Sequence, residues 1–253
     1  MPYALRAYAY WFASYKRVWR GTIASSILNP VLYLAALGVG LGKLVNKGAN
    51  PLGVPYLDYV APGLLAAVAM QVCTIEGAFP IRGAVLWGKQ YWAMLATPLR
   101  AIDLLFGHVL WVATRAAMVT AVYLVVISAF GAVHSGLAVL TLPVGMLIGL
   151  SFAIPVSAIS IAAERDPFNP LFRFGIMPLF LFSGTFFPIT RLPQGLRELA
   201  YVTPLWHGVD LMRGLTLGTA TPLRSLVHVA YFGVWITLTT YIAYRAYRKK
   251  LIV

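Results

Sequence analysis

Long apolar runs are the feature that most constrains the fold of this chain. Several stretches of its 253 residues remain apolar for roughly 20 residues, the length that an α-helix needs to cross a hydrocarbon core of ~30 Å. Apolar residues make up 60% of the chain and charged residues 11%, with a mean hydropathy of +0.79, which exceeds what a soluble domain needs. The sequence therefore predicts an all-α, polytopic membrane protein that forms a single domain over residues 1–253.

Six membrane-spanning helices are predicted from these runs and from the turn-forming residues between them. They cover residues about 21–41, 59–79, 104–130, 137–163, 170–187 and 225–244. Residues 131–136 predict a tight turn between the third and fourth spans. Asp166 and Asn169, each followed by a proline, supply N-caps for the fifth span. Pro178 and Gly184 are expected to bend or break that helix.

Three segments outside the spans have a helical character of their own. Residues 3–20 mix aromatic residues with four cations, which is typical of an amphipathic helix in the headgroup region. Residues 80–103 are too polar for a span and too apolar for a free loop, so we expect them to lie against the membrane. Residues 188–224 carry apolar residues at helical spacing that Pro204 interrupts, which predicts two short amphipathic helices in the outer interface.

The distribution of basic residues favours one orientation of these spans. Thirteen cations would lie on the side of the two termini: Arg6, Lys16, Arg17, Arg20, Arg82, Lys89, Arg100, Arg165, Arg173, Arg245, Arg248, Lys249 and Lys250. Six would lie on the other side: Lys43, Lys47, Arg191, Arg197, Arg213 and Arg224. Because Lys and Arg accumulate in cytoplasmic loops, we expect both termini in the cytoplasm and the chain in the cell membrane. Topology explains the net charge of +13 better than nucleic-acid binding does.

Motifs for catalysis or nucleotide binding are missing from the sequence. Gly38–Leu44 superficially resembles a phosphate-binding loop, but Leu37 stands where a glycine is required and Leu44 replaces the magnesium-binding hydroxyl residue. The four histidines are scattered, and no G-x-S-x-G or H-E-x-x-H pattern occurs. Cys73 is the only cysteine, so neither a disulfide nor a cysteine-based zinc site can form within the chain. We therefore expect no catalytic residue, no metal site and no cofactor here, and any ATP hydrolysis in another chain.

Polar residues inside the predicted spans are candidates for function, because burying them in lipid is unfavourable. Glu76 is expected to snorkel or to pair with Arg82 or His108, which we favour over contact with substrate. Arg115 lies deeper, on one helical stripe with His108. Binding of an anionic head group would satisfy Arg115, and so would an interhelical hydrogen bond to a carbonyl or to Gln71.

Four motifs, in their order along the chain, resemble those of type-2 ATP-binding-cassette (ABC-2) permeases. They are NPVLYLAALGVGLG at residues 29–42, APGLLAAVAM at 61–70, YWAMLATPLRAIDLLFGHVLW at 91–111 and SGTFFPITRLP at 183–193. The last two are the most specific, and the resemblance covers nearly all of the chain. Within the family the chain is most similar to the nodulation-protein-J-like branch, whose members resemble lipooligosaccharide exporters, and next to daunorubicin-resistance-type permeases.

This resemblance implies partners and site residues. The partners would be two copies of an ABC ATPase subunit, which binds ATP and Mg on the cytoplasmic face, and a second copy of the permease or a similar permease. A coupling helix within residues 88–99 would present these anchors to the ATPase: Lys89, Gln90, Tyr91, Trp92 and Met94. Re-entrant extracellular helices would follow Phe187. The predicted substrate pathway or gate comprises Gln71, Arg115, Phe182, Phe186 and Phe187.

Together these expectations describe the permease subunit of an ABC exporter for an amphipathic or hydrophobic substrate such as a lipid, a glycolipid or a drug, working among membrane lipids. A secondary transporter driven by an ion gradient is the alternative. It would need ionisable groups at the midplane on broken helices, often in two related halves, and here only Arg115 is deep and no internal duplication is visible. An intramembrane enzyme would need a nucleophile and a base at matched depth.

Overall fold

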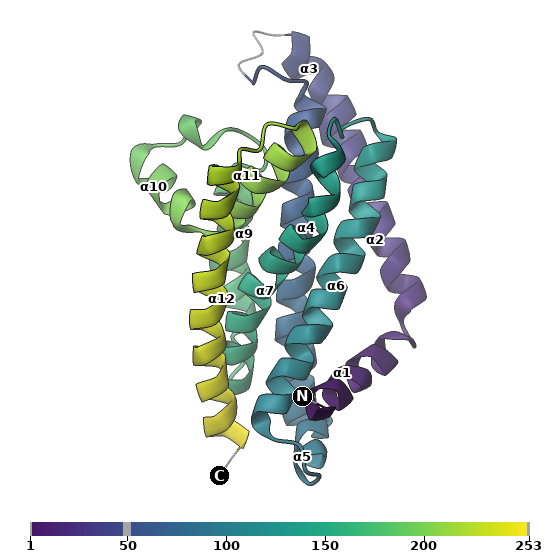
Figure 1. Cartoon of the computed structure of the whole chain (residues 1–253), viewed down its shortest axis with the longest axis vertical. Helices are drawn as coiled ribbons and strands as arrows, with labels where there is room; N and C mark the ends of the chain where they lie inside the picture. Colours follow the sequence, from purple (N-terminus) through teal and green to yellow (C-terminus); the bar gives the residue numbers. More distant parts are fainter. Residues whose placement is uncertain (1, 48–51, 252–253) are drawn as a thin grey trace.

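The computed structural model describes residues 2–47 and 52–251, and over these residues the chain is all-α, as predicted (Figure 1). Within the described residues, four helices are long and apolar enough to cross a membrane: Tyr56–Trp87, Ala101–Ala129, Gly136–Ala162 and Pro222–Leu251. They coincide with the second, third, fourth and sixth predicted spans. Phe168–Phe182, which overlaps the fifth predicted span, forms a shorter apolar helix.

In the part of the chain that the structure describes, the first helices are α1 (Pro2–Tyr15), α2 (Trp19–Tyr33), the π-helix η1 (Leu34–Leu41), α3 (Gly42–Lys47), α4 (Tyr56–Arg82), the π-helix η2 (Gly83–Trp87) and α5 (Gln90–Leu95). The middle of the chain forms α6 (Ala101–Ala129), the 3-10 helix η3 (Gly136–Leu140), α7 (Thr141–Ala162), α8 (Phe168–Pro170), the π-helix η4 (Leu171–Ile176) and α9 (Met177–Phe182). The last helices are the 3-10 helix η5 (Ile189–Arg191), α10 (Gln194–Val202), α11 (Pro204–Leu217) and α12 (Pro222–Leu251). The first predicted span therefore corresponds to the continuous helix α2–η1–α3, and the fifth to α8–η4–α9.

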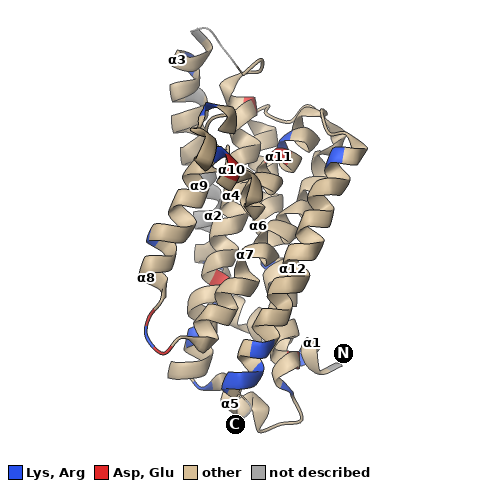
Figure 2. Cartoon of the chain, turned by 90° about the vertical axis from the view of Figure 1, so that its left-hand side faces the viewer, with Lys and Arg blue, Asp and Glu red and all other residues tan. Residues whose placement is uncertain are grey.

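The two ends of the molecule differ in what they carry. Both termini and α5 lie at one end, whereas α3, α10 and α11 lie at the other (Figure 1). Many of the Lys and Arg residues gather at the end with the termini, including the last turn of α12 (Figure 2). We call the two ends the basic end and the α11 end.

Helix α4 lies at the centre of the fold and packs against α6, α7 and α11. Its side chains Val60, Leu64 and Met70 are fully buried in the main core cluster. Small residues permit the closest approach, because a Cβ at Gly77 would collide with the backbone of Ala153 on α7. Close backbone packing through glycine is a common way for helices to associate in a membrane.

The two ends of the fifth helix can be compared with the capping and helix-breaking residues predicted from the sequence. The Asp166 carboxylate accepts a hydrogen bond from the Phe168 backbone N–H at 3.0 Å. The N-cap position of α8 is nevertheless Pro167, which has no side-chain cap, and Asn169 lies within α8, so the two predicted N-caps are not observed. The helix passes through Pro178 without a break and ends at Phe182, before Gly184 adopts a φ of 82°. The expectation that this helix reaches residue 187 is therefore wrong, because the left-handed backbone at Gly184 ends it.

Part of the segment 80–103, expected to lie against the membrane, continues the neighbouring helices instead. The helix of the second span extends through η2 to Trp87, because Ile81, Ala84 and Val85 remain buried against the rest of the fold. After α5, α6 already begins at Ala101. Only the short α5 hairpin, residues 88–100, leaves the two long helices.

The segment 188–224 forms two helices that meet at Pro204, as the sequence predicts. The second of them is not positioned as expected. In α11, Leu205, Val209 and Met212 are buried in the core of the chain itself rather than in an outer membrane interface. Helix α10 keeps exposed apolar side chains, among them Leu199.

Candidate functional site

A buried ion pair between α4 and α6 is the central polar feature of the apolar interior. The Nε atom of Arg115 donates to Oε1 of Glu76 at 3.0 Å, and only 4% of the Arg115 side chain is exposed. The indole N–H of Trp111 donates to the other oxygen of Glu76 at 3.0 Å. A terminal nitrogen of Arg115 also donates to the Tyr15 hydroxyl at 3.1 Å, which connects the pair to α1. The cluster thus joins three helices.

These contacts correct the partners that the sequence suggested. Arg115 pairs with Glu76 and not with Gln71, and Glu76 pairs with neither Arg82 nor His108. Arg82 donates instead to the backbone carbonyls of residues 163 and 164 at the end of α7. His108 is buried against Trp11, with ring centroids 5.1 Å apart, and its ring nitrogens have no hydrogen-bond partner among the described residues.

Two large cavities open beside these helices. One, of about 700 Å³, lies between α2, α4 and α8–η4–α9, and its lining includes Gln71, Tyr33 and Phe172. The other, of about 610 Å³, lies between α1, α2 and α6 and is lined in part by Arg115. We call them the α4 groove and the α1 cavity.

The predicted pathway residues do not share one cavity. Gln71 lines the α4 groove and Arg115 lines the α1 cavity, on different sides of the bundle. Phe182 lines a small pocket of about 120 Å³ between α9 and α10. Phe186 packs edge-on against Phe180 on α9, with centroids 5.0 Å apart, and Phe187 is 37% exposed. A common pathway for these five residues therefore remains a prediction.

The SGTFFP motif forms a turn that side chains from α4 and α11 hold in place. Arg213 donates to the Gly184 carbonyl at 2.9 Å and to the Tyr59 carbonyl at 3.2 Å. Its guanidinium also lies over the Tyr59 ring, 3.8 Å from the centroid. A Cβ at Gly63 would come within 2.8 Å of the Thr185 carbonyl, so the turn rests directly on the backbone of α4. The sequence analysis counted Arg213 only as an outside cation and missed this contact.

Helix α5 presents some of the predicted anchors and hides one. Lys89 and Trp92 are exposed, and the Trp92 indole donates to the Val85 carbonyl at 3.1 Å, which fixes its direction. Gln90 and Met94 are partly buried. Tyr91 is fully buried, so the expectation that it would contact a soluble partner is wrong. Its ring packs on Trp11 of α1 and Tyr247 of α12.

Two of the histidines that looked scattered in sequence meet at the α11 end. His207 of α11 and His228 of α12 share a hydrogen bond between their Nδ1 atoms at 2.8 Å. The other nitrogen of His228 lies 2.9 Å from Asp210, which also pairs with Arg224. Burial, and to a smaller extent the neighbouring His228, lower the pKa of His207 to about 4. The sequence contained one indication of this cluster. The spacings place each pair on one helix face: His207-x-x-Asp210 and Arg224-x-x-x-His228.

Asp210 is held ionised by these neighbours. Burial alone would raise the pKa of its carboxyl, but the hydrogen bond from His228 and the charge of Arg224 hold the pKa below its ordinary value. A second pair at the same end joins His134 to Asp58, at 2.8 Å. Among the described residues, no group of three His, Cys, Asp or Glu side chains is arranged to hold a metal ion.

The family of this chain follows from these features together with comparison to known proteins. Residues 7–217, from α1 to the last turn of α11, match the family described as ABC-2 type transporter, and the chain belongs to this family of membrane transport subunits. Members of the family work with an ATP-binding subunit.

The relatives of this chain have nearly its own length. It is 30% identical to nodulation protein J of Rhizobium leguminosarum bv. viciae over 250 residues, which cover 95% of each chain. Identity to nodulation protein J of Rhizobium leguminosarum bv. trifolii is 31% over 250 residues, covering 96% of this chain and 94% of the relative. A nodulation protein J of Bradyrhizobium diazoefficiens is 27% identical with the same coverage.

Proposed function

We propose that this chain is the membrane permease of an exporter that moves an amphipathic or hydrophobic substrate across the cell membrane, powered by ATP hydrolysis in a separate subunit. The observation that carries the proposal is the family match over residues 7–217, which includes α5 and the turn at Gly184. The proposed substrate is a lipid, a glycolipid such as a lipooligosaccharide, or a drug, as the resemblance to the nodulation-protein-J-like and daunorubicin-resistance-type branches implies.

The proposed topology has six spans. To the four long apolar helices it adds α2–η1–α3 and α8–η4–α9, which lie beside them in the same bundle. Both termini would face the cytoplasm, because the basic end carries the cations at the end of α12 and those around α1. The α11 end, with α10 and α11, would then face the outside.

The proposed partner contact is the α5 hairpin. It protrudes at the basic end, carries Lys89 and Trp92, and follows directly on the 71%-exposed Trp87 at the end of η2. Exposed aromatic and cationic side chains beside a turn are effective anchors for a protein partner. Two ATPase subunits, each with bound ATP and Mg, would dock on two permeases in this way.

The α4 groove is the proposed substrate contact and the face toward a second permease. Its walls come from the first, second and fifth proposed spans and are mainly aromatic and apolar, with Gln71, Asp166, Asn169 and Arg173 as polar points. A cavity with apolar walls and a few polar groups suits an amphipathic molecule better than an ion. The turn at Gly184 would limit the pathway at the α11 end, close to Phe186 and Phe187.

Coupling can be tested in proteoliposomes that contain the permease and its ATPase. We expect Trp92→Ala and Lys89→Ala to reduce transport per ATP hydrolysed at least tenfold, while the variants remain folded, because both side chains are exposed. Lys43→Ala, an exposed lysine near the opposite end, serves as the control. Unchanged coupling in both α5 variants, or transport by the permease alone under an ion gradient, would contradict the proposal.

A further inference from the structure

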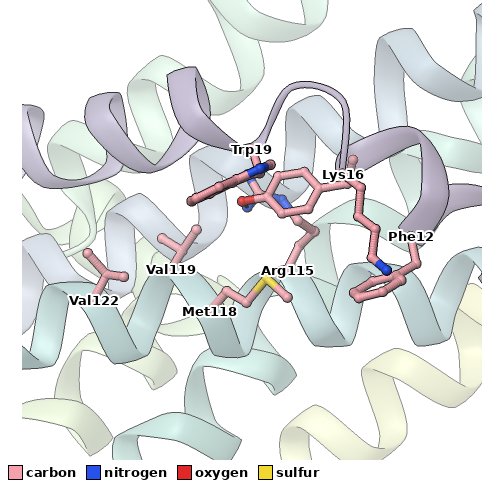
Figure 3. A pocket seen from close by; sticks show the side chains of 8 residues that line it. Phe12, Lys16, Trp19, Arg115, Met118, Val119 and Val122 are labelled. Atoms are coloured by element: carbon pink, nitrogen blue, oxygen red, sulfur yellow. Dashed lines mark hydrogen bonds between the residues drawn. The ribbon is translucent and has the colours of Figure 1, made fainter.

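The α1 cavity is a large space separate from the α4 groove (Figure 3). It measures about 610 Å³ and lies where α1 turns into α2 and both face α6. Its lining consists of Phe12, Tyr15, Lys16, Trp19, Arg115, Met118, Val119 and Val122. Its volume is in the range of sites that bind small organic ligands.

One part of the α1 cavity is cationic. Lys16 reaches over the Phe12 ring (Figure 3), with Nζ 4.9 Å from the centroid, and the Arg115 guanidinium lies over the Tyr15 ring, with Cζ 4.6 Å from its centroid. Glu76 balances the charge of Arg115, so Lys16 supplies the net positive charge. The hydrogen bonds to Glu76 and Tyr15 use two of the five N–H donors of the guanidinium. This part of the cavity suits an anionic, oxygen-rich group.

The remainder of the α1 cavity is apolar. Met118, Val119 and Val122 follow one another along α6, away from Lys16, and Trp19 lies over them (Figure 3). The side chains of Met118, Val119 and Val122 offer no polar partner, so a small hydrated anion would leave this part of the cavity unfilled. An elongated apolar chain would bury its surface here, and such burial is favourable by about 25 cal/mol for each Å².

We propose that the α1 cavity binds an anionic phospholipid of the surrounding bilayer, with its phosphate beside Lys16 and Arg115 and an acyl chain along Met118 and Val122. The level of the cavity in the bilayer supports this occupant. Arg17 and Arg20 lie in and just after the turn between α1 and α2 and are exposed, which marks the headgroup level of an anionic leaflet. The proposal rests on membrane insertion but not on the proposed export activity.

Lipid-dependent stability of the purified chain in detergent provides the test. The unfolding temperature and the lipid retained in native mass spectrometry would be measured with phosphatidylglycerol, phosphatidylcholine or inorganic phosphate. We expect phosphatidylglycerol alone to raise the unfolding temperature and to be retained. Lys16→Gln should weaken its binding about fivefold, the effect of one cation at a charged membrane surface. Val122→Trp should weaken binding further by filling the apolar part.

Two control variants separate the cavity from general surface effects. Arg17→Gln removes a neighbouring exposed cation that does not line the cavity, and Val125→Trp places the same ring on an exposed part of α6. Both should bind phosphatidylglycerol like the natural chain. Equal responses to both lipids, a response to inorganic phosphate alone, or equal losses in Lys16→Gln and Arg17→Gln would each overturn the proposal. Because Lys16 is exposed, its variant is expected to fold normally.

Discussion

Replacing Glu76 with glutamine tests how the buried cluster between α4 and α6 stabilises the chain. Both carboxylate oxygens accept a hydrogen bond, one from Arg115 and one from Trp111. A glutamine of the same shape has a single oxygen, so its amide N–H groups must face one of these two donors. The substitution also leaves the charge of Arg115, whose side chain is 4% exposed, without its counter-ion.

The expected loss of stability follows from these two effects. Removing one partner of a buried ion pair destabilises a protein by about 3–5 kcal/mol. Glu76 is 18% exposed, and Tyr15 remains as a partner for Arg115, so we expect a value near the lower end, about 3 kcal/mol. Glu164→Gln, in the exposed loop after α7, is the matched control and should change stability by less than about 0.5 kcal/mol.

A double-mutant cycle measures the interaction directly. The free energy of unfolding in mixed micelles would be determined for Glu76→Gln, Arg115→Gln and the double variant. Because the double variant contains no unpaired charge, we expect it to be more stable than the sum of the single losses predicts, by about 1–3 kcal/mol. Strictly additive losses would show that the two side chains do not interact in the folded chain, and the reasoning would fail.

Two further predictions concern the α11 end. Gly63→Ala places a methyl group 2.8 Å from the Thr185 carbonyl and should lower the free energy of unfolding by about 1–3 kcal/mol, whereas Gly195→Ala, with no atom within 4 Å, should be neutral or stabilising; chemical denaturation checks both. The pKa of His207 is lowered from 6.5 to about 4, so stability that requires its neutral form is complete above pH 6.5 and decreases as the pH falls toward 4. The unfolding temperature should therefore decrease from pH 7 to pH 5, and less in His207→Phe; equal decreases in both proteins would contradict the assignment.

The spans were the most predictable part of the fold. Hydropathy over about 20 residues reports directly on what a bilayer accepts, and four long apolar helices coincide with predicted spans. Helix ends were less predictable, because a helix continues wherever other side chains cover it. Thus α4 and η2 extend to Trp87 because Ile81 and Val85 are buried by the fold. The local signals at the start of the fifth helix gave its position only to within a few residues, because Asp166 bonds to the Phe168 N–H while Pro167 occupies the N-cap position.

Partners of polar side chains could not be chosen from sequence, because they depend on how each helix is rotated. Gln71 and Glu76 are five residues apart and therefore differ by about 140° around α4. The rotation of α4 thus decides which of the two faces Arg115, and the sequence does not give that rotation. His207 and His228 lie on different helices, and their contact depends on how α11 and α12 cross. Tyr91 was expected to be exposed because its neighbours are polar, yet distant parts of the chain cover it.

The enclosure of Tyr91 links the short hairpin to both extremities of the polypeptide. Its ring centroid lies 6.3 Å from that of Trp11 and 6.2 Å from that of Tyr247, although 80 and 156 residues separate them along the chain. Any tilt of α5 must therefore displace the first and last helices together. A fluorescent label at either terminus would report such a tilt without altering the hairpin surface.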